Sequence, residues 1–353
     1  MGRSETTCRV SAKAIRTGIG PGRVRDGLEK GQQVAAYGGI ELGGTKCVCA
    51  VGDGSDGAWA GRVIPTTDPE TTTRSAIDWF RAVQQTSGPL VSLGVASFGP
   101  LDLAIGAIAQ ATPKVAWRGW PVVDRFEQAL GVPAHIDTDV NAAALAEQTW
   151  GAAQGCSDVC YVTIGTGVGV GAIVNGAMVH GLSHPEAGHM RFPQHPTDRD
   201  PGAPEHMWAG NCPFHGSCWE GLASGPARAK RAALWEQASA DPPDALVLES
   251  EYIALGLVNL ISTYRPQRIV LSGGVMHEVG LLQSVRRRAC ELLDESYFPE
   301  AREIEDLVVA PALGDAAGVV GAILLAAELR PGHMQSRPVG PLVTRIADEL
   351  ART

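Results

Sequence analysis

Three side chains that bind soft or borderline metal ions lie close together in the sequence, namely Cys212, His215 and Cys218. Their loop also contains Pro213 and Gly216, and thiolate and imidazole groups at this spacing are typical of a zinc site. One further ligand would complete a tetrahedron, and the best candidate is His189, with His184, His195 and His206 as competitors. Four protein ligands leave no open position for a water molecule, so the zinc ion would be structural.

A glycine pair that could bind phosphate follows the first predicted strand, in the sequence Glu41-Leu42-Gly43-Gly44-Thr45-Lys46. Because glycine has no side chain, such a turn exposes backbone N–H groups to an anion. Thr45 would add a hydroxyl donor and Lys46 a positive charge, and Glu41 would hold a hydrated Mg²⁺ ion between the phosphates. Taken alone the motif is weak, since most glycine pairs only make hairpin turns.

The same kind of turn recurs later in the chain. Thr163-Ile164-Gly165-Thr166-Gly167-Val168-Gly169 again places small residues and hydroxyl groups between two predicted strands. A third glycine pair, Gly273-Gly274, follows an apolar strand and precedes a helix, which is where an open α/β sheet offers a crevice for a nucleotide. The recurrence favours phosphate binding, although an ordinary turn explains the third segment equally well by itself.

Asp139 is the candidate general base. Phosphoryl transfer to an alcohol needs a base beside the attacking hydroxyl, a metal ion that bridges the phosphates and tight positioning. Asp139 lies where a predicted strand ending near Thr138 meets a helix, so its carboxylate should project between two halves of the chain. Two alternatives stay open: Asp139 could be only the N-cap of the helix 141–150, and Asp137 could be the base if the strand continues through Thr138.

Strands and helices alternate along the chain after an initial β-meander. The predicted strands are 39–42, 46–51, 59–64, 90–96, 132–136, 159–164, 168–174, 268–272 and 307–309, and the predicted helices are 70–85, 121–130, 141–150, 246–264, 281–293 and 316–329. The order of strand, glycine turn and strand in 40–51 restarts at 159–174, which indicates an internal duplication. We therefore expect two related α/β lobes that join near Thr138.

Composition and charge limit the classes of function. The chain has 353 residues, 44% apolar residues and a net charge of −9, with no run of five or more Lys or Arg. A nucleic-acid surface is therefore disfavoured. The sequence contains neither an uninterrupted apolar stretch of about 18 residues nor a signal peptide, so we expect a cytoplasmic protein. Residues 1–36 are basic and broken by glycines, and we interpret them as a mobile tail rather than a DNA-reading module.

Together these segments resemble the ROK family of bacterial sugar kinases and repressors, within the superfamily of actin, sugar kinases and heat-shock ATPases. The resemblance depends on the three glycine segments and on two motifs, Ser183 to Met190 and Cys212 to Gly225. Ser97 to Asp102, Ala111 to Arg118 and Asp137 to Asn141 further resemble the branch of zinc-containing fructokinases. The likeness runs from about Tyr37 to about Leu329.

The resemblance implies a fold of two duplicated actin-like (ribonuclease H-like) ATPase lobes with a cleft between them. It implies that His189 is the fourth zinc ligand and that Asp139 is the catalytic base. The residues implied to bind the sugar are Gly99, Asp139, Glu186, His189 and Glu220, and those implied to bind ATP are Gly43, Gly44, Thr45, Lys46, Thr163, Gly165, Thr166, Gly167, Gly273 and Gly274.

Two positions depart from the family pattern. Thr138 stands where many relatives have Asn, which puts the sugar contacts at that position in doubt. Glu41 stands where the wider superfamily has Asp, and its longer side chain would change how many water molecules separate it from Mg²⁺. Lys114, Trp117 and Arg118 match the family, but their chemistry alone assigns them no role.

We therefore expect an ATP-dependent hexose kinase, specifically a fructokinase that makes fructose 6-phosphate, with Mg²⁺ as cofactor and a structural Zn²⁺ ion. The alternatives are a kinase for another hexose or a sugar-like cyclitol, and a sugar-sensing regulator of the ROK type. The expected partners are ATP and a hexose, with no nucleic acid and no membrane, and the oligomeric state stays open with a homodimer as the family's frequent form. The small lobe should comprise 37–138 with about 315–330, and the larger lobe 139–314 with the zinc loop 189–218, before a C-terminal extension at 331–353.

Overall fold

The computed structural model describes residues 36–53, 58–239 and 242–327. The chain divides into Met1–Gln33 and Val34–Thr353, and all the described residues belong to the second unit. Apart from Ala36, the predicted tail lies outside the described residues, as does the predicted C-terminal extension at 331–353. The predicted lobe boundaries stay a prediction.

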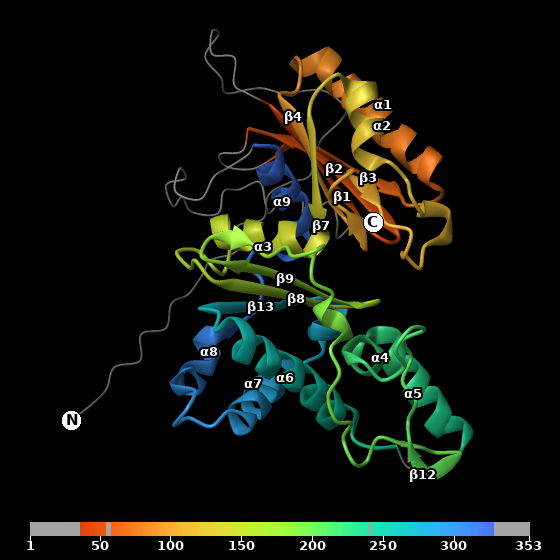
Figure 1. The fold of residues 1–353 in the computed structure, drawn as a ribbon, viewed down its shortest axis with the longest axis vertical. Coiled ribbons are helices and arrows are strands. Elements are labelled where there is room, and N and C mark those ends of the chain that lie inside the picture. Colours follow the sequence, from red (N-terminus) through yellow and green to blue (C-terminus); the bar gives the residue numbers. More distant parts are fainter. Residues whose placement is uncertain (1–35, 54–57, 240–241, 328–353) are drawn as a thin grey trace, which may run out of the picture. The chain divides into compact units, whose positions relative to one another are not determined.

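Two five-stranded sheets share one topology (Figure 1). The first has the order β3-β2-β1-β4-β7 and consists of β1 (Tyr37–Leu42), β2 (Lys46–Gly52), β3 (Ala58–Pro65), β4 (Ser92–Ser97) and β7 (Ala134–Thr138). The second has the order β10-β9-β8-β13-β14 and consists of β8 (Val159–Ile164), β9 (Val168–Val174), β10 (Ala177–Met178), β13 (Arg268–Ser272) and β14 (Val308–Val309). In each sheet an antiparallel meander is extended by two parallel strands, which confirms the predicted duplication.

Helices pack on both faces of the two sheets (Figure 1). Helices α3 and α9 pack against each other in a layer that contacts both sheets. The helices are α1 (Pro69–Ser87), α2 (Val122–Leu130), α3 (Asp139–Trp150), α4 (Trp219–Ala223), α5 (Gly225–Gln237), α6 (Ala245–Tyr264), α7 (Leu281–Leu292), α8 (Ile304–Leu307) and α9 (Ala317–Ala326). The short strands are β5 (Leu101–Asp102), β6 (Ala107–Ile108), β11 (Arg199–Asp200) and β12 (Ala203–Met207), and single 3₁₀ turns cover Val115–Trp117, Ala187–His189, Gly274–His277, Pro299–Glu303 and Gly314–Ala316.

Close packing in the layer of α3 and α9 requires residues without side chains. A Cβ atom on Gly94 of β4 would lie 1.9 Å from the carbonyl oxygen of Ala322, and one on Gly321 would lie 1.9 Å from the carbonyl oxygen of Ala142. Atoms of a packed interior cannot approach so closely, so glycine is needed at both positions. The packing holds the first turn of α3, which carries Asp139, against the same helix α9 that covers the end of β1.

The start of α3 corrects one sequence expectation. Thr138, not Asp139, is the N-cap, because its hydroxyl accepts a hydrogen bond from the Asn141 N–H (3.2 Å) and the helix already begins at Asp139. Strand β7 does continue through Thr138. A second hydroxyl-bearing residue beside the aspartate therefore takes the capping position and frees the Asp139 carboxylate from that structural role.

Several elements were not predicted, notably α4, α5 and the short strands β10, β11 and β12. The strands are too short to show alternation, and α5 buries few of its residues, so its sequence carries a weak helical pattern. Helix α9 agrees with the predicted helix 316–329 up to Ala326, and the last predicted residues lie outside the described ones.

Helix α6 is, among the described residues, the one helix that is long and apolar enough to cross a membrane. More than half of it is buried in the structure, where Leu248, Tyr252 and Leu257 belong to the apolar core of the second sheet. Core packing therefore accounts for its apolar composition.

Candidate functional site

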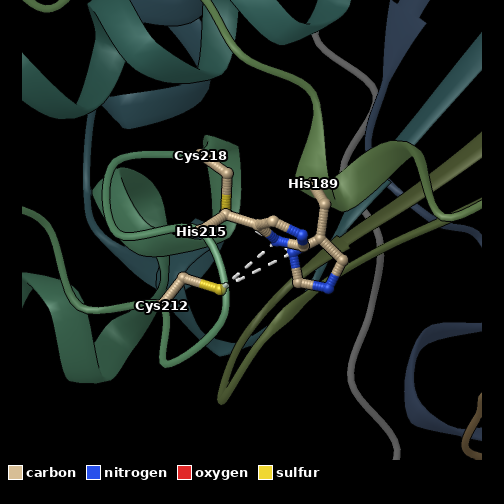
Figure 2. Close-up of side chains that lie close together, drawn as sticks. All are labelled: His189, Cys212, His215 and Cys218. Carbon is tan, nitrogen blue, oxygen red and sulfur yellow. Dashed lines mark hydrogen bonds between the residues drawn. The ribbon is translucent and has the colours of Figure 1, made fainter. Parts of the chain in front are cut away.

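Four side chains form a compact cluster of potential metal ligands, namely His189, Cys212, His215 and Cys218 (Figure 2). All four ligand atoms lie within 4.8 Å of one another. Nδ1 of His189 is 3.4 Å from Sγ of Cys218 and 3.8 Å from Sγ of Cys212, which is also 3.8 Å from Nδ1 of His215. The side chains point toward one another from two separate segments of the chain (Figure 2).

The separations in this cluster fit a tetrahedral zinc site. With Zn–S near 2.3 Å and Zn–N near 2.0–2.1 Å, the nitrogen-to-sulfur edge of a tetrahedron is about 3.5 Å. Burial raises the pKa of the Cys218 thiol to about 11, so this sulfur would be protonated without a cation beside it. The donor set of two sulfurs and two nitrogens therefore suits Zn²⁺, which would ionise the thiols as it binds.

The loop that carries three of the four ligands is fixed by backbone hydrogen bonds. Cys212 and Gly216 form an isolated antiparallel bridge, with N–H to oxygen distances of 3.1 and 3.0 Å. Gly216 has a φ of +60°, a conformation that favours glycine. The N–H of Trp219 donates to the Met190 carbonyl (2.9 Å), which joins the loop to the segment that carries His189.

The other histidines that competed for the fourth ligand position have different partners. Nε2 of His184 accepts from the Leu101 N–H (2.8 Å), and Nδ1 of His195 lies 2.7 Å from the Thr197 hydroxyl. His206 is exposed and lies 3.6 Å from Glu205. The cluster geometry therefore selects His189 from the alternatives that the sequence left open.

Asp139, at the start of α3, and Asp315, just before α9, lie close enough to Glu41 of β1 for their charges to interact with it. Glu41 lies at the end of β1, and its Oε2 atom is buried without a hydrogen-bond partner among the described residues. Burial, followed by the charges of Asp139 and Asp315, raises the pKa of Glu41 to about 7, while Lys46 lowers it. An orphaned carboxylate oxygen among three acidic groups suits a divalent cation, and it supports the expected Mg²⁺ site at Glu41.

Asp139 extends from the first turn of α3 toward the same group of acids. Its Oδ1 accepts from the Val140 N–H (2.9 Å). Burial raises the pKa of Asp139 to about 6, the Val140 N–H lowers it, and the charge of Glu186 raises it further. A carboxylate that titrates close to neutral pH is suited to act as a general base.

Asp137, the alternative base, is fully engaged in a buried network. Its Oδ1 accepts from the N–H of Thr138 (2.7 Å) and from the side-chain amide of Asn141 (2.9 Å). Its Oδ2 lies 2.9 Å from Nε2 of His180, a histidine that sequence reasoning missed. These contacts give Asp137 a structural role and favour Asp139 as the base.

Of the residues expected to bind the sugar, Gly99 and Glu186 lie beside His184, and His189 and Glu220 lie near Glu186. A Cβ atom on Gly99 would lie 3.1 Å from Cε1 of His184 and 3.5 Å from Oε1 of Glu186. Burial raises the pKa of Glu186, the charge of His189 lowers it, and that of Glu220 raises it. Glu220 also accepts from the Val168 N–H (3.2 Å), so it connects this group to the second glycine turn.

The first glycine turn has the tight geometry that its sequence predicts. The Gly43 N–H donates to the Lys46 carbonyl (3.0 Å), and the Gly43 carbonyl accepts from the Thr66 hydroxyl (2.9 Å). Gly44 and Thr45 are exposed at the tip of the turn. Nζ of Lys114, to which the sequence assigned no role, donates to the Gly44 carbonyl (3.1 Å).

The second and third glycine segments meet at a cavity of about 1330 Å³. Gly165, Thr166 and Gly274 line it, and the Gly165 carbonyl accepts from the Gly225 N–H (2.8 Å) at the start of α5. A Cβ atom on Gly273 would lie 2.3 Å from the Ile164 carbonyl oxygen, so Gly273 brings the ends of β8 and β13 together instead of lining the cavity. Thr163 and Gly167 also lie outside the lining.

Helices α5 and α6 supply the side chains of the cavity that the sequence did not indicate. Arg228 and Trp235 come from α5 and Glu249 from α6. Arg228 forms ion pairs with Glu249 and Glu278, the first with a nitrogen-to-oxygen distance of 3.4 Å. These residues carry no motif, and they line the cavity because α5 and α6 both flank it, linked by the ion pairs of Arg228 and Arg231 with Glu249.

Comparison with known proteins shows which family of proteins this chain is similar to. Residues 37–329 match the family model described as the ROK family. The chain is 45% identical to a fructokinase from Zymomonas mobilis over 82% of this chain and 96% of that protein, and 34% identical to a fructokinase from Streptococcus mutans over 83% of this chain and 98% of that protein.

A solved structure of a ROK family protein has a similar fold. The ROK family glucokinase from Streptomyces griseus, in complex with glucose and AMPPNP, superposes with a TM-score of 0.63 at 26% identity. The match covers 84% of this chain and 100% of that one. This chain therefore belongs to the ROK family.

Proposed function

We propose that this protein is an ATP-dependent fructokinase that transfers the γ-phosphoryl group of ATP to the 6-hydroxyl of D-fructose. The observation that carries the proposal is the position of the Asp139 carboxylate at the start of α3, close enough to both Glu41 and Glu186 for their charges to interact. Glu41 belongs to the first phosphate turn and Glu186 to the sugar group. The fructokinases among its relatives support fructose as the acceptor.

The nucleotide would bind along the glycine segments. The cavity beside Gly165, Thr166 and Gly274 is large enough for a nucleoside, and the exposed Gly43-Gly44-Thr45 turn would receive the terminal phosphates. Mg²⁺, held through Glu41, would neutralise phosphate charge when bound. Backbone N–H groups and the Lys46 ammonium would orient the phosphates for in-line transfer.

The sugar would bind between Gly99, Glu186, His189 and Glu220. Carboxylates accept hydrogen bonds from neighbouring hydroxyl groups, and Gly99 leaves space for the ring because it has no side chain. Asp139 would accept the proton of the primary hydroxyl as that oxygen attacks phosphorus. Zinc at His189, Cys212, His215 and Cys218 would hold Glu186 and Glu220 in place, a structural function that takes no part in the transfer.

An assay of ADP release across a panel of hexoses and cyclitols tests the proposal. We expect fructose to give the highest kcat/KM, with mannose, glucose and inositol as the comparison substrates. A higher kcat/KM for one of these would replace fructose but keep the kinase. Sugar binding without ADP release for any compound would favour a sugar-sensing regulator.

The pH dependence of the reaction should follow the ionisation of Asp139. Only the deprotonated carboxylate can accept a proton, so kcat/KM for fructose should rise about tenfold per pH unit below about pH 6 and level off above it. Initial rates between pH 4.5 and 8, in protein whose fold is checked by circular dichroism, measure this profile. A flat profile between pH 5 and 7 would contradict the assignment of the base.

Filling the cavity should weaken nucleotide binding selectively. Ala229 is exposed on α5 and lines the cavity, so Ala229→Trp would place an indole where the nucleoside binds. We expect KM for ATP to rise at least about tenfold, a loss of about 1.4 kcal/mol, with KM for fructose unchanged. Lys230→Met, at the next position but outside the lining, is the matched control. An unchanged KM for ATP in Ala229→Trp would place the nucleoside elsewhere.

A further inference from the structure

Lys114 lies between the two groups of residues that the reaction has to bring together. Its Nζ donates to the carbonyl of Gly44, at the tip of the first glycine turn, across 70 positions of sequence. The same ammonium lies 5.0 Å from the ring centroid of Phe98, the residue immediately before the sugar-site Gly99. A Cβ atom on Gly44 would lie 3.2 Å from Nζ. The cation is therefore in contact with both the phosphate turn and the sugar loop.

The segment around Lys114 is built to hold this position. The Lys114 N–H donates to the Thr112 hydroxyl (3.4 Å), which itself donates to the Gly99 carbonyl (3.3 Å). The buried Trp117 packs edge-on against Phe98, with ring centroids 5.5 Å apart, and its indole N–H donates to the Thr67 carbonyl (3.2 Å). Trp117 therefore anchors the short 3₁₀ turn that follows Lys114 to the segment after β3.

Arg118 ties the other end of the same segment. Its Nε donates to the Thr112 carbonyl (3.1 Å), which closes the chain around Lys114 into a compact loop. This contact and that of Trp117 explain why the three residues occur together in one motif. Trp117 and Arg118 therefore hold the segment that carries Lys114.

The charge of Lys114 is not neutralised by the residues around it. Its two described neighbours are a carbonyl oxygen and an aromatic face, which solvate an ammonium without cancelling its charge. Across residues 36–53, 58–239 and 242–327, no carboxylate forms an ion pair with it. An ammonium has three N–H donors, and the Gly44 carbonyl uses one of them. A half-buried cation in this state is suited to receive an anion.

We propose that Lys114 is a further catalytic residue, whose ammonium donates a hydrogen bond to an oxygen of the phosphoryl group as that group passes from ATP to the sugar. This inference rests on the proposed function. The bond between the γ-phosphorus and the bridging oxygen of ADP breaks, the bond between phosphorus and the sugar oxygen forms, and the sugar proton moves to Asp139. Lys114 keeps its own proton throughout and stabilises the charge on the transferred group.

Three variants test this role: Lys114→Met, Lys114→Arg and the matched control Lys230→Met, which removes an exposed lysine of α5. We expect Lys114→Met to lower kcat about 10²–10³-fold, the effect of removing one donor to a developing charge. KM for fructose should change less than about threefold, because the contact forms only in the transition state. Lys114→Arg should recover part of kcat, and Lys230→Met should equal the wild type.

A transition-state mimic separates catalysis from a structural role. Binding of ADP with aluminium fluoride and fructose should weaken at least about tenfold in Lys114→Met, while binding of ADP alone stays as in the wild type. Equal weakening of both would mean that Lys114 only shapes the turn, and it would overturn the proposal. So would a raised KM for fructose at unchanged kcat, or wild-type kcat in Lys114→Met. If the wild type itself phosphorylates no sugar, the proposed function has failed instead, which the hexose panel shows independently.

Discussion

Replacing Asp139 by asparagine is expected to lower kcat for fructose phosphorylation about 10²–10⁴-fold, the usual contribution of a positioned general base. The amide has nearly the same shape as the carboxylate but cannot accept the proton of the attacking hydroxyl. Fructose should still bind, because Glu186, His189 and Glu220 remain. Initial-rate kinetics together with calorimetric titration of fructose separate these two effects.

The matched control for this variant is Asp124→Asn, which changes an exposed aspartate in the first turn of α2. It should keep wild-type kcat. Retention of more than a tenth of kcat in Asp139→Asn would show that another group removes the proton.

The stability of Asp139→Asn is expected to equal or exceed that of the wild type at pH 7. The pKa of Asp139 is raised by folding from its ordinary value of 3.8 to about 6, so the folded state binds the proton more tightly. The stability associated with that proton is present below about pH 4 and is lost as the pH rises through about 6. Asparagine carries no charge and avoids this cost, so lost activity in this variant cannot be attributed to unfolding. Thermal melts at pH 7 measure it.

Loss of the zinc ligands is the second change with a large expected effect. The double variant Cys212→Ser with Cys218→Ser should reduce bound zinc from about one per chain to less than a tenth of that, because serine is a poor ligand for Zn²⁺. The melting temperature should fall by at least about 5 °C, since structural zinc contributes directly to folding. KM for fructose should rise more than KM for ATP, because Glu186 and Glu220 lie beside the metal ligands. Elemental analysis, thermal melts and initial rates measure the three effects.

Cys156→Ser with Cys290→Ser provides the matched control, because both thiols are half-buried and lie outside the cluster. This control should retain full zinc content and wild-type KM values. One zinc per chain in the Cys212 and Cys218 double variant would refute the ligand set.

The sequence predicts those parts of the site whose functional residues lie close together along the chain. Cys212, His215 and Cys218 lie within one loop, and each glycine turn follows a predicted strand. Short segments of sequence are therefore enough to predict a metal site and phosphate-binding turns. The duplication was also accessible, because the pattern of strand, turn and strand occurs twice. The structure supports the expected choice of His189, because His189 lies in the cluster while Nε2 of His184 accepts from the Leu101 N–H.

Other features depend on contacts between distant segments and were not predictable. The pairing of His180 with Asp137 and the contact of Lys114 with Gly44 join residues whose local sequences show no common pattern. The predicted N-cap of α3, Asp139, was wrong. Thr138 and Asp139 are both good capping residues, and only the backbone geometry selects between them. The charged lining of the cavity arises in the same way, from residues of α5 and α6 that are far apart in the sequence and flank one cavity.

Transfer of labelled phosphate tests the central claim most directly. The protein would be incubated with fructose and ATP that carries ¹⁸O in the nonbridging oxygens of its γ-phosphate, and the products would be analysed by mass spectrometry and ³¹P NMR. The account predicts that the label appears in fructose phosphorylated at its 6-hydroxyl, with ADP as the other product. Label found only in free phosphate, or no consumption of ATP in the presence of fructose, would contradict it.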